Sequence, residues 1–131
     1  MPEQDLSLGR AVVCVPARNE ANALPRLIRS LNRQYGTGDG ARLRVVVLAN
    51  NCNDDTVAML HGLERNAEIP HLALRILEAT IASPHAHVGT ARRRALDAGA
   101  AWLEQEGVTE GVLLSTDADA VAPADWVTAN L

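Results

Sequence analysis

The chain has 131 residues, which suits one domain, and 47% of them are hydrophobic, which excludes disorder by composition. A net charge of −4 gives no electrostatic argument for nucleic acid or an anionic membrane, and no apolar run approaches the roughly 20 residues of a membrane span. Residues 1–5 lack the basic segment of a secretory signal, and two cysteines, Cys14 and Cys52, are too few for a disulfide framework. We therefore expect one cytoplasmic domain with two buried thiols.

The first predicted unit is a strand followed by a helix. Residues 11–15 form a continuous, β-branched-rich apolar run that ends at Pro16, which is typical of a strand buried on both faces. Apolar residues at helical spacing then predict a helix over about residues 22–34, with Asn22 as its cap and Pro25 in its first turn. The residues with this spacing are Leu24, Leu27, Ile28 and Leu31.

The second unit repeats this order. A glycine-rich loop over 36–40 separates the first helix from a second buried strand over 45–49. Asp54 or Asp55 then begins a second helix. The apolar residues of that helix are Val57, Leu60 and Leu63.

The second half of the chain continues the alternation. Its predicted elements are a strand over 71–77 after Pro70, a loop over 81–87, an alanine-rich helix over 88–105 that stops at Gly107, a strand over 112–114 and a short helix near Pro123. Alternating strands and helices predict a Rossmann-like α/β fold, in which a mainly parallel sheet carries helices on both faces. Ligands of such sheets bind beyond the carboxyl ends of the strands.

The carboxylates of Asp117 and Asp119 follow the strand predicted at 112–114. Mg²⁺ and Mn²⁺ prefer hard oxygen ligands, and Mg²⁺ is often held by one or two carboxylates together with substrate phosphates. In an extended segment, residues two apart point the same way, so both carboxylates could face one metal that offsets the charge of a diphosphate. The pattern predicts a metal–diphosphate site, and the alternative is a solvated turn with a helix cap.

Polar residues also follow the first two strands. Five of the seven residues in 50–56 carry an amide or a carboxylate, and these could hydrogen-bond a nucleobase or ribose. The alternative is a strand-to-helix turn capped by Asn53 or Asp54. In residues 16–20, Arg18 could meet a phosphate while the neighbouring backbone shapes a base pocket, and again a plain turn is the alternative.

Two further patterns are less informative. Arg92, Arg93 and Arg94 lie in the first turns of the long helix, and at about 100° per residue they cannot share one face. At most one or two of them can therefore reach a ligand. His85 and His87 resemble a metal pair, but no third ligand lies near them in the sequence, so we expect no metal there.

Four stretches in chain order resemble the N-terminal half of the inverting family-2 glycosyltransferases, which have the GT-A fold. The stretches are 12–20 with its Pro-x-x-Asn-Glu turn, 50–56 with its Asp-x-Thr, 88–92 with its Gly-x-Ala-Arg, and 116–119 with its Asp-Ala-Asp, continued over 121–126. The resemblance covers nearly the whole chain. It implies a nucleotide-diphospho-sugar donor, Mg²⁺ or Mn²⁺ as cofactor, and transfer of the sugar to an unknown acceptor.

The resemblance also implies roles for single residues. Asn50 stands where many members carry an acid that contacts the base, so the chain departs from the family there. Arg92 would lie near the diphosphate or the base pocket. Asp117 would touch the ribose or sugar side, and Asp119 would ligate the metal with Asp117 beside it. The residues that would border the donor are Pro16, Ala17, Asn19, Glu20, Asn50, Arg92 and Asp117.

Family members usually run on well beyond the position of Leu131, and the later part carries the acceptor pocket and a carboxylate thought to deprotonate the acceptor. An inverting transfer needs such a base, and no residue here stands in its position, so the catalytic residue stays unassigned. We therefore expect residues 1–131 to be a nucleotide-sugar-binding domain without the acceptor part, which the missing part could leave inactive alone. Its open sheet would expose an edge through which it could associate.

Three other classes of protein remain as alternatives. A nucleotidyltransferase usually carries a glycine-rich loop after the first strand, and residues 16–20 contain no glycine. A non-catalytic fragment or binding module would depend on a partner. A dinucleotide-binding protein is disfavoured, because no Gly-x-Gly-x-x-Gly follows the first strand.

Overall fold

The computed structural model describes residues 8–38, 40–82 and 88–131. Within these ranges, four strands alternate with helices along the chain. The elements are β1 (Ala11–Ala17), α2 (Leu24–Leu31), β2 (Leu43–Asn50), α3 (Thr56–Arg65), β3 (Leu72–Ala79), α4 (Val88–Gln105), β4 (Val112–Ser115) and α5 (Trp126–Ala129). The predicted alternation is confirmed, and α4 has the predicted bounds.

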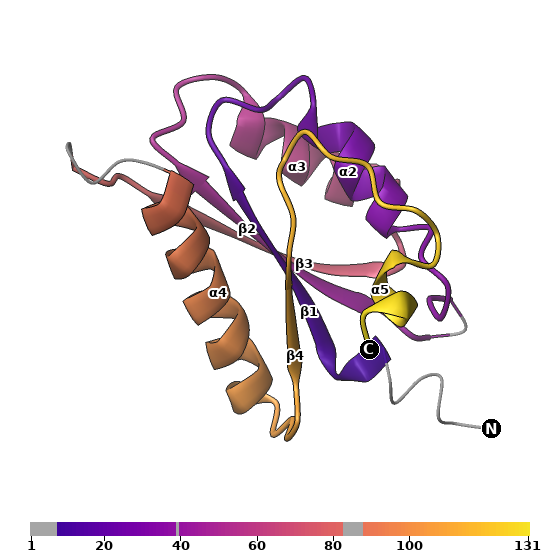
Figure 1. Cartoon of the computed structure of the whole chain (residues 1–131). Coiled ribbons are helices and arrows are strands. Elements are labelled where there is room, and N and C mark those ends of the chain that lie inside the picture. Colours follow the sequence, from indigo (N-terminus) through magenta and orange to yellow (C-terminus); the bar gives the residue numbers. More distant parts are fainter. Residues whose placement is uncertain (1–7, 39, 83–87) are drawn as a thin grey trace.

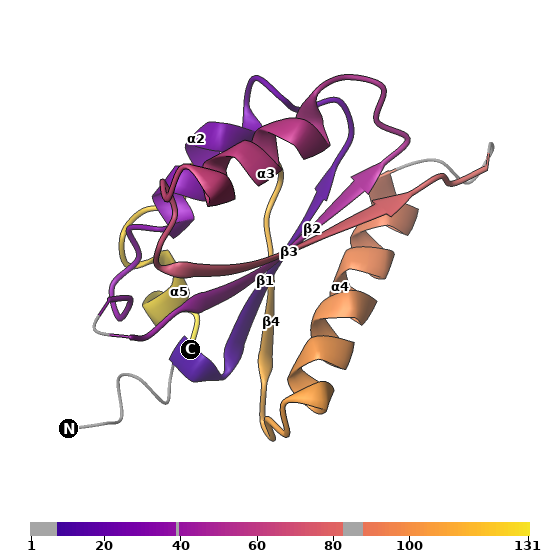
Figure 2. The same cartoon turned by 180° about the vertical axis from the view of Figure 1, so that it is seen from behind.

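The strands form one parallel sheet in the order β3-β2-β1-β4. Helices α2 and α3 cover one face and α4 covers the other, as Figures 1 and 2 show from opposite sides. The predicted Rossmann-like α/β fold is therefore confirmed. β3 and β4 lie at the edges of the sheet, where Leu77 and Leu113 are partly exposed. Within the described ranges, no helix is long and apolar enough to cross a membrane.

β1 and β2 are buried on both faces of the sheet. On β1, Val13 and Val15 belong to the core shared with α2 and α3, whereas Val12 and Cys14 belong to the core shared with α4. α4 lies very close to β1 at Gly99, where a Cβ atom would stand 2.6 Å from Cys14 Sγ. The continuous apolar runs of the sequence thus mark strands that are covered twice, as predicted.

β1 ends two residues later than the sequence predicts. Pro16 does not stop the strand, because it pairs with Leu48 and the strand continues to Ala17. A proline lacks the N–H group that a central strand normally needs. The carbonyl of Cys14, two residues earlier, faces β4 and accepts the N–H of Thr116, and the pairing with β4 stops there. Pro16 therefore lacks its N–H group on the side where β4 has already ended.

α2 is shorter than predicted, and Asn22 does not cap it. The helix begins two residues later and ends three residues earlier than the predicted range of 22–34. Its N-cap residue is Ala23, and no side chain caps it. The carbonyl of Glu20 instead accepts the first helical N–H at 2.9 Å, so a backbone turn replaces the side-chain cap. Pro25 lies in the first turn, as predicted.

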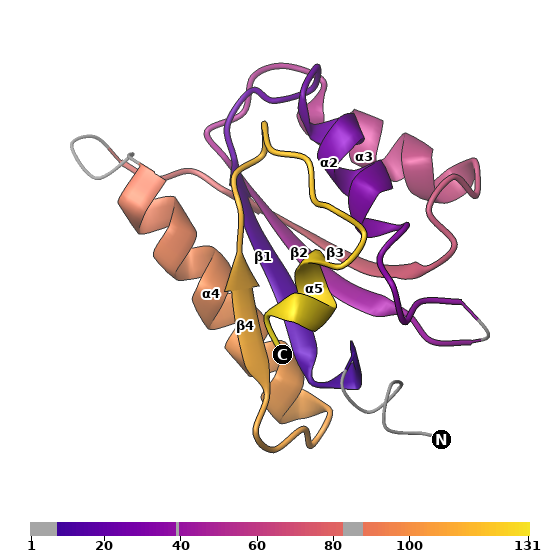
Figure 3. The same ribbon diagram turned by 45° about the vertical axis from the view of Figure 1, so that its right-hand side comes forward.

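After β4 the chain turns at the sheet edge and returns alongside α2 to α5, as Figure 3 shows. The N–H of Ala122 donates to Ser30 Oγ at 3.0 Å, and the N–H of Tyr35 donates to the carbonyl of Ala124 at 2.8 Å. α5 then places Val127 in the core formed with α2 and α3. The last part of the chain is thereby fixed against the first part.

Candidate functional site

The polar clusters predicted from the sequence meet at one edge of the sheet. Because all four strands are parallel, their carboxyl ends lie on the same side, at the top of Figure 1. The loops that leave this edge are 18–23 after β1, 51–55 after β2 and 116–125 after β4. The first turn of α4 reaches the same edge through Arg92, which contacts Asp117. This is the edge at which such sheets bind ligands.

The loops after β1 and β2 are hydrogen-bonded to each other. Asn19 Oδ1 accepts the N–H of Asn53 at 2.8 Å, and the N–H of Asn19 donates to Cys52 Sγ at 3.4 Å. Asn19 and Asn51 both have left-handed backbones, with φ of 54° and 52°, which asparagine tolerates better than most residues. The two loops therefore form a single unit, and the exposed Asn19 is held within it.

Asp54 and Thr56 fasten this unit to the start of α3. The carboxylate of Asp54 accepts the N–H of Thr56 at 3.0 Å, the hydroxyl of Thr56, and the N–H of Ala21 at 3.3 Å. Thr56 Oγ1 accepts the N–H of Glu20 at 3.1 Å. These bonds, the one from the Thr56 hydroxyl first, lower the pKa of Asp54 below its ordinary value. The Asp54 side chain therefore serves the strand-to-helix turn, as the alternative predicted, although the N-cap residue of α3 is Asp55 and not Asn53 or Asp54.

Asn51 also has a structural task. Its amide donates to the carbonyl of Ile81 at 3.0 Å and accepts the N–H of Ile81 at 2.8 Å. Its own N–H donates to the carbonyl of Ala79 at 2.9 Å. Asn51 thereby holds the chain that leaves β3. Asn50 is nearly buried at the end of β2, where the alternation of Val46 and Leu48 places it on the α4 face.

The carboxylates of Asp117 and Asp119 lie in a turn and not in the extended segment that the sequence argument assumed. The N–H of Ala120 donates to the carbonyl of Asp117 at 3.0 Å and closes the turn. Ala118 is buried between the two carboxylates, which are both exposed. The prediction of an extended segment is therefore wrong, but the buried Ala118 still leaves both carboxylates on the solvent side.

Arg92 lies beside this turn. Its Nη2 is 2.5 Å from Asp117 Oδ1, and the two side chains are 39% and 62% exposed. The structure thus brings together a cation from α4 and a carboxylate from the β4 loop that stand 25 residues apart. Both side chains are accessible enough to exchange this contact for one with a ligand.

A divalent cation at this turn would need more ligands than the side chains of the described residues supply. Within the described ranges, no group of three or more His, Cys, Asp or Glu side chains could hold a metal. Two exposed carboxylates, Asp117 and Asp119, nevertheless match the one or two that Mg²⁺ commonly uses when phosphates and water complete its shell. The donor set therefore fits a metal that arrives with a diphosphate. His85 and His87 lie outside the described residues.

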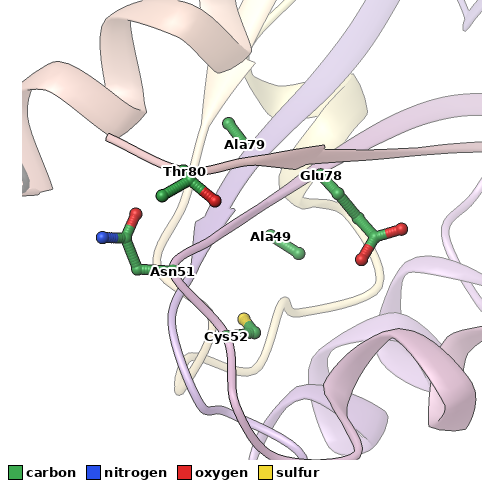
Figure 4. Close-up of a pocket in the computed structure, with 6 residues that line it drawn as sticks. All are labelled: Ala49, Asn51, Cys52, Glu78, Ala79 and Thr80. Carbon is green, nitrogen blue, oxygen red and sulfur yellow. The ribbon is translucent and has the colours of Figure 1, made fainter. Parts of the chain in front are cut away.

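A small open pocket of about 140 Å³ lies between the ends of β2 and β3 (Figure 4). This volume is below the roughly 300 Å³ of a complete small-molecule site, so the pocket can take only part of a ligand. Glu78 and Thr80 were not among the predicted site residues. They follow the predicted third strand, so the rule that ligands bind beyond the carboxyl ends of the strands could have found them. The lining residues are Ala49, Asn51, Cys52, Glu78, Ala79 and Thr80.

The remaining predicted residues differ in exposure. Pro16 and Ala17 are buried in β1, so they can border a ligand only through their backbone. Cys14 is buried, as predicted, and burial raises the pKa of its thiol to about 12. Cys52 is only half-buried, which corrects the expectation of two buried thiols, because it lies in a loop beside the pocket and not in the sheet.

A parallel α/β sheet with helices on both faces, whose polar loops gather at the carboxyl ends of its strands, places the chain in the class of doubly wound α/β folds. The family model for glycosyl transferase family 2 matches residues 12–129. The chain belongs to this family. A search of curated proteins finds no match.

The chain also aligns with solved structures that share its fold. The chain aligns with S. aureus TarS 1–349 in complex with UDP, with a TM-score of 0.64 and 19% identity over 92% of this chain and 30% of that chain. It also aligns with the mannosyltransferase PcManGT from Pyrobaculum calidifontis in complex with GDP-Man and Mn²⁺, with a TM-score of 0.62 and 27% identity over 88% of this chain and 29% of that chain. The fold is therefore of the GT-A type, and the chain spans about 30% of the length of these structures.

Proposed function

We propose that this chain is the donor-binding part of an inverting, metal-dependent glycosyltransferase. It binds a nucleotide-diphospho-sugar at the carboxyl ends of β1, β2 and β4. The observation that carries the proposal is the contact of Arg92 with Asp117 beside the exposed Asp119, in a chain of glycosyl transferase family 2. A cation and two carboxylates at one strand end can together hold a diphosphate and its metal.

In this proposal, Asp119 would hold Mg²⁺ or Mn²⁺ together with Asp117, and a metal bound there would supply positive charge to offset that of the departing diphosphate. Arg92 exchanges its contact with Asp117 for one with the diphosphate. The nucleoside lies along the joined loops that contain Asn19 and Glu20, near Asn50. Support comes from PcManGT, which is described in complex with GDP-Man and Mn²⁺, and from TarS, which is described in complex with UDP and with UDP-GlcNAc.

Transfer of the sugar also requires an acceptor and a base that deprotonates its hydroxyl. The chain spans about 30% of the solved structures that it matches, so we assign the acceptor site and the base to protein outside residues 1–131. We propose a cytoplasmic location. The free thiols Cys14 and Cys52 suit a reducing compartment.

A partner-dependent binding module is the second candidate function. The observation that favours it is the pair of sheet edges, where Leu77 on β3 and Leu113 on β4 are each 38% exposed. An unpaired edge with apolar side chains is suited to pairing with another chain. Sedimentation of the purified chain tests this candidate, since a stable monomer at high concentration contradicts association through an edge.

Calorimetric titration tests the leading proposal. UDP-GlcNAc and GDP-mannose are titrated into the chain with and without Mn²⁺, and we expect at least one of them to bind only when Mn²⁺ is present. Asp119→Ala should abolish the metal-dependent part of binding, whereas Asp97→Ala, an exposed carboxylate further along α4, should not. Equal binding by wild type and Asp119→Ala would overturn the proposal.

A further inference from the structure

Two buried polar side chains near the end of α2 hold the segment that follows Asp119. Ser30 and Gln34 are 3% and 2% exposed. Ser30 Oγ accepts the N–H of Ala122 at 3.0 Å while its hydroxyl donates to the carbonyl of Leu27 at 2.6 Å. These bonds connect α2 to a residue 92 positions later in the chain.

Gln34 holds the same segment at a point after the bond between Ser30 and Ala122. Its Nε2 donates to the carbonyl of Pro123 at 2.6 Å, and its Oε1 accepts the N–H of Val127 at 2.9 Å. One amide therefore satisfies a carbonyl before α5 and an N–H group inside it. An apolar side chain of the same size would fill the same space but leave the buried N–H of Val127 without this partner, while the carbonyl of Pro123 would keep only the N–H of Trp126.

Small side chains allow the segment to lie this close to α2. Along residues 118–124, every second residue is an alanine, and these alanines are less exposed than the residues between them. The alternation shows that this segment presents its alanine side to the core under α2. Ala118, Ala120 and Ala122 all belong to, or pack against, the core formed with α2 and α3. A larger inward side chain would push the backbone away from the Ser30 and Gln34 side chains.

We infer that Ser30 and Gln34 are positioning residues for the carboxylate turn, an inference that rests on the proposed function. The turn closes through the bond from Ala120 to Asp117, and the bond from Ala122 to Ser30 lies two residues further on. The exposed carboxylates of Asp117 and Asp119 keep their relative placement because the chain behind them is fixed to a rigid helix. Both side chains are buried, so each acts through the backbone that it holds.

Amide hydrogen exchange tests the structural part of this inference. In Ser30→Ala and Gln34→Met, we expect the N–H of Ala120 to exchange faster than in wild type, by about tenfold or more, while amides in the middle of β1 keep their rates. Ile28→Val is the matched control, because it perturbs the core of the same helix and keeps every side-chain hydrogen bond from Ser30 and Gln34 to the segment. Unchanged exchange at Ala120 in both variants would overturn the inference, and if Gln34→Met does not fold, Ser30→Ala alone decides.

Titration of UDP and GDP in the presence of Mn²⁺ tests the functional part. We expect Ser30→Ala and Gln34→Met to raise the metal-dependent dissociation constant about tenfold, as loss of an outer support commonly does. Ser30→Thr, which keeps the hydroxyl, should have the dissociation constant of the wild type, and so should Ile28→Val. Wild-type affinity in both variants would contradict the inference. Failure of the wild type to bind either nucleotide overturns the proposed function itself, while exchange at Ala120 still decides whether the two residues fix the turn.

Discussion

Arg92 Nη2 and Asp117 Oδ1 lie 2.5 Å apart, which joins the first turn of α4 to the loop after β4. The pair is well exposed, so it contributes little to the stability of the fold. Its position suggests instead that the cation is kept beside the carboxylates and is available to an arriving diphosphate. The effect of Arg92 on the stability of the fold and its effect on ligand binding can be measured separately.

Arg92→Ala should weaken binding of UDP or GDP with Mn²⁺ by about 1.5–3 kcal/mol, the range for hydrogen bonds to charged groups. The free energy of unfolding should change by less than about 1 kcal/mol, because an exposed ion pair is lost. Calorimetry and urea unfolding give the two quantities. Arg93→Ala, the exposed neighbour on α4, is the control and should affect neither. A loss of stability without a loss of binding would show that Arg92 is structural.

Gly99→Ala should destabilise the fold by about 1–3 kcal/mol, as overpacking of a core does. The new Cβ would lie 2.6 Å from Cys14 Sγ and 3.0 Å from Val12 Cγ1, so α4 or β1 must move. Gly62→Ala offers the opposite test on α3, since nothing lies within 4 Å of its Cβ position. Alanine there should stabilise the helix by up to about 1 kcal/mol. Urea unfolding of both variants checks the prediction, which fails if they shift the midpoint in the same direction.

Acid should weaken the joined loops through Asp54. Its pKa is lowered in the folded chain, so the stabilisation is complete above the ordinary carboxylate value and is lost as the pH falls through the folded value. Asp54→Asn should therefore make unfolding less pH-dependent below about pH 4. Glu106, whose pKa is lowered chiefly by Arg44, contributes in the same direction at another place. Glu106→Gln is thus the comparison, and only Asp54→Asn should alter exchange of the Ala21 amide.

The two thiols should react at different rates. Burial raises the pKa of Cys14 to about 12, so in the folded chain its thiolate is scarce and inaccessible. Cys52 is half-buried and lines the pocket between β2 and β3. Alkylation followed by mass spectrometry should modify Cys52 first and Cys14 only under denaturing conditions. Early modification of Cys14 would contradict the packing of α4 on β1, and protection of Cys52 by UDP or GDP would support the proposed donor site.

The strands and the long helix could be predicted because their signals are local. An apolar run such as 11–15 is typical of a strand buried on both faces, and the long alanine-rich stretch of 88–105 favours a helix. The ends of α2 could not be predicted. The helix begins where the N–H of Leu24 donates to the carbonyl of Glu20, and just after its end Gln34 contacts the distant Pro123. Sequence spacing carries no information about partners about 90 residues away.

The candidate site, like the fold, could be predicted from the sequence only in part. The rule that ligands bind beyond the carboxyl ends of the strands located the polar clusters, since parallel strands bring these ends to one edge of the sheet. It did not tell which polar side chains serve the loops themselves, as Asn51 and Asp54 do. Nor did it show that Asp117 and Asp119 lie in a turn, because the turn depends on the burial of Ala118 against a core built by other elements.

The bonds of Ser30 and Gln34 to residues 122–127 also constrain how the chain can fold during its synthesis. α2 is made before its partners. Ser30 in α2 and Gln34 just after it find their bonding partners only after about 90 further residues have left the ribosome. Until then this face of the sheet must stay hydrated or be covered by something else. The smallest unit able to complete its own core therefore reaches at least Val127, and a nascent chain that stalls before it presents an unfinished surface to chaperones.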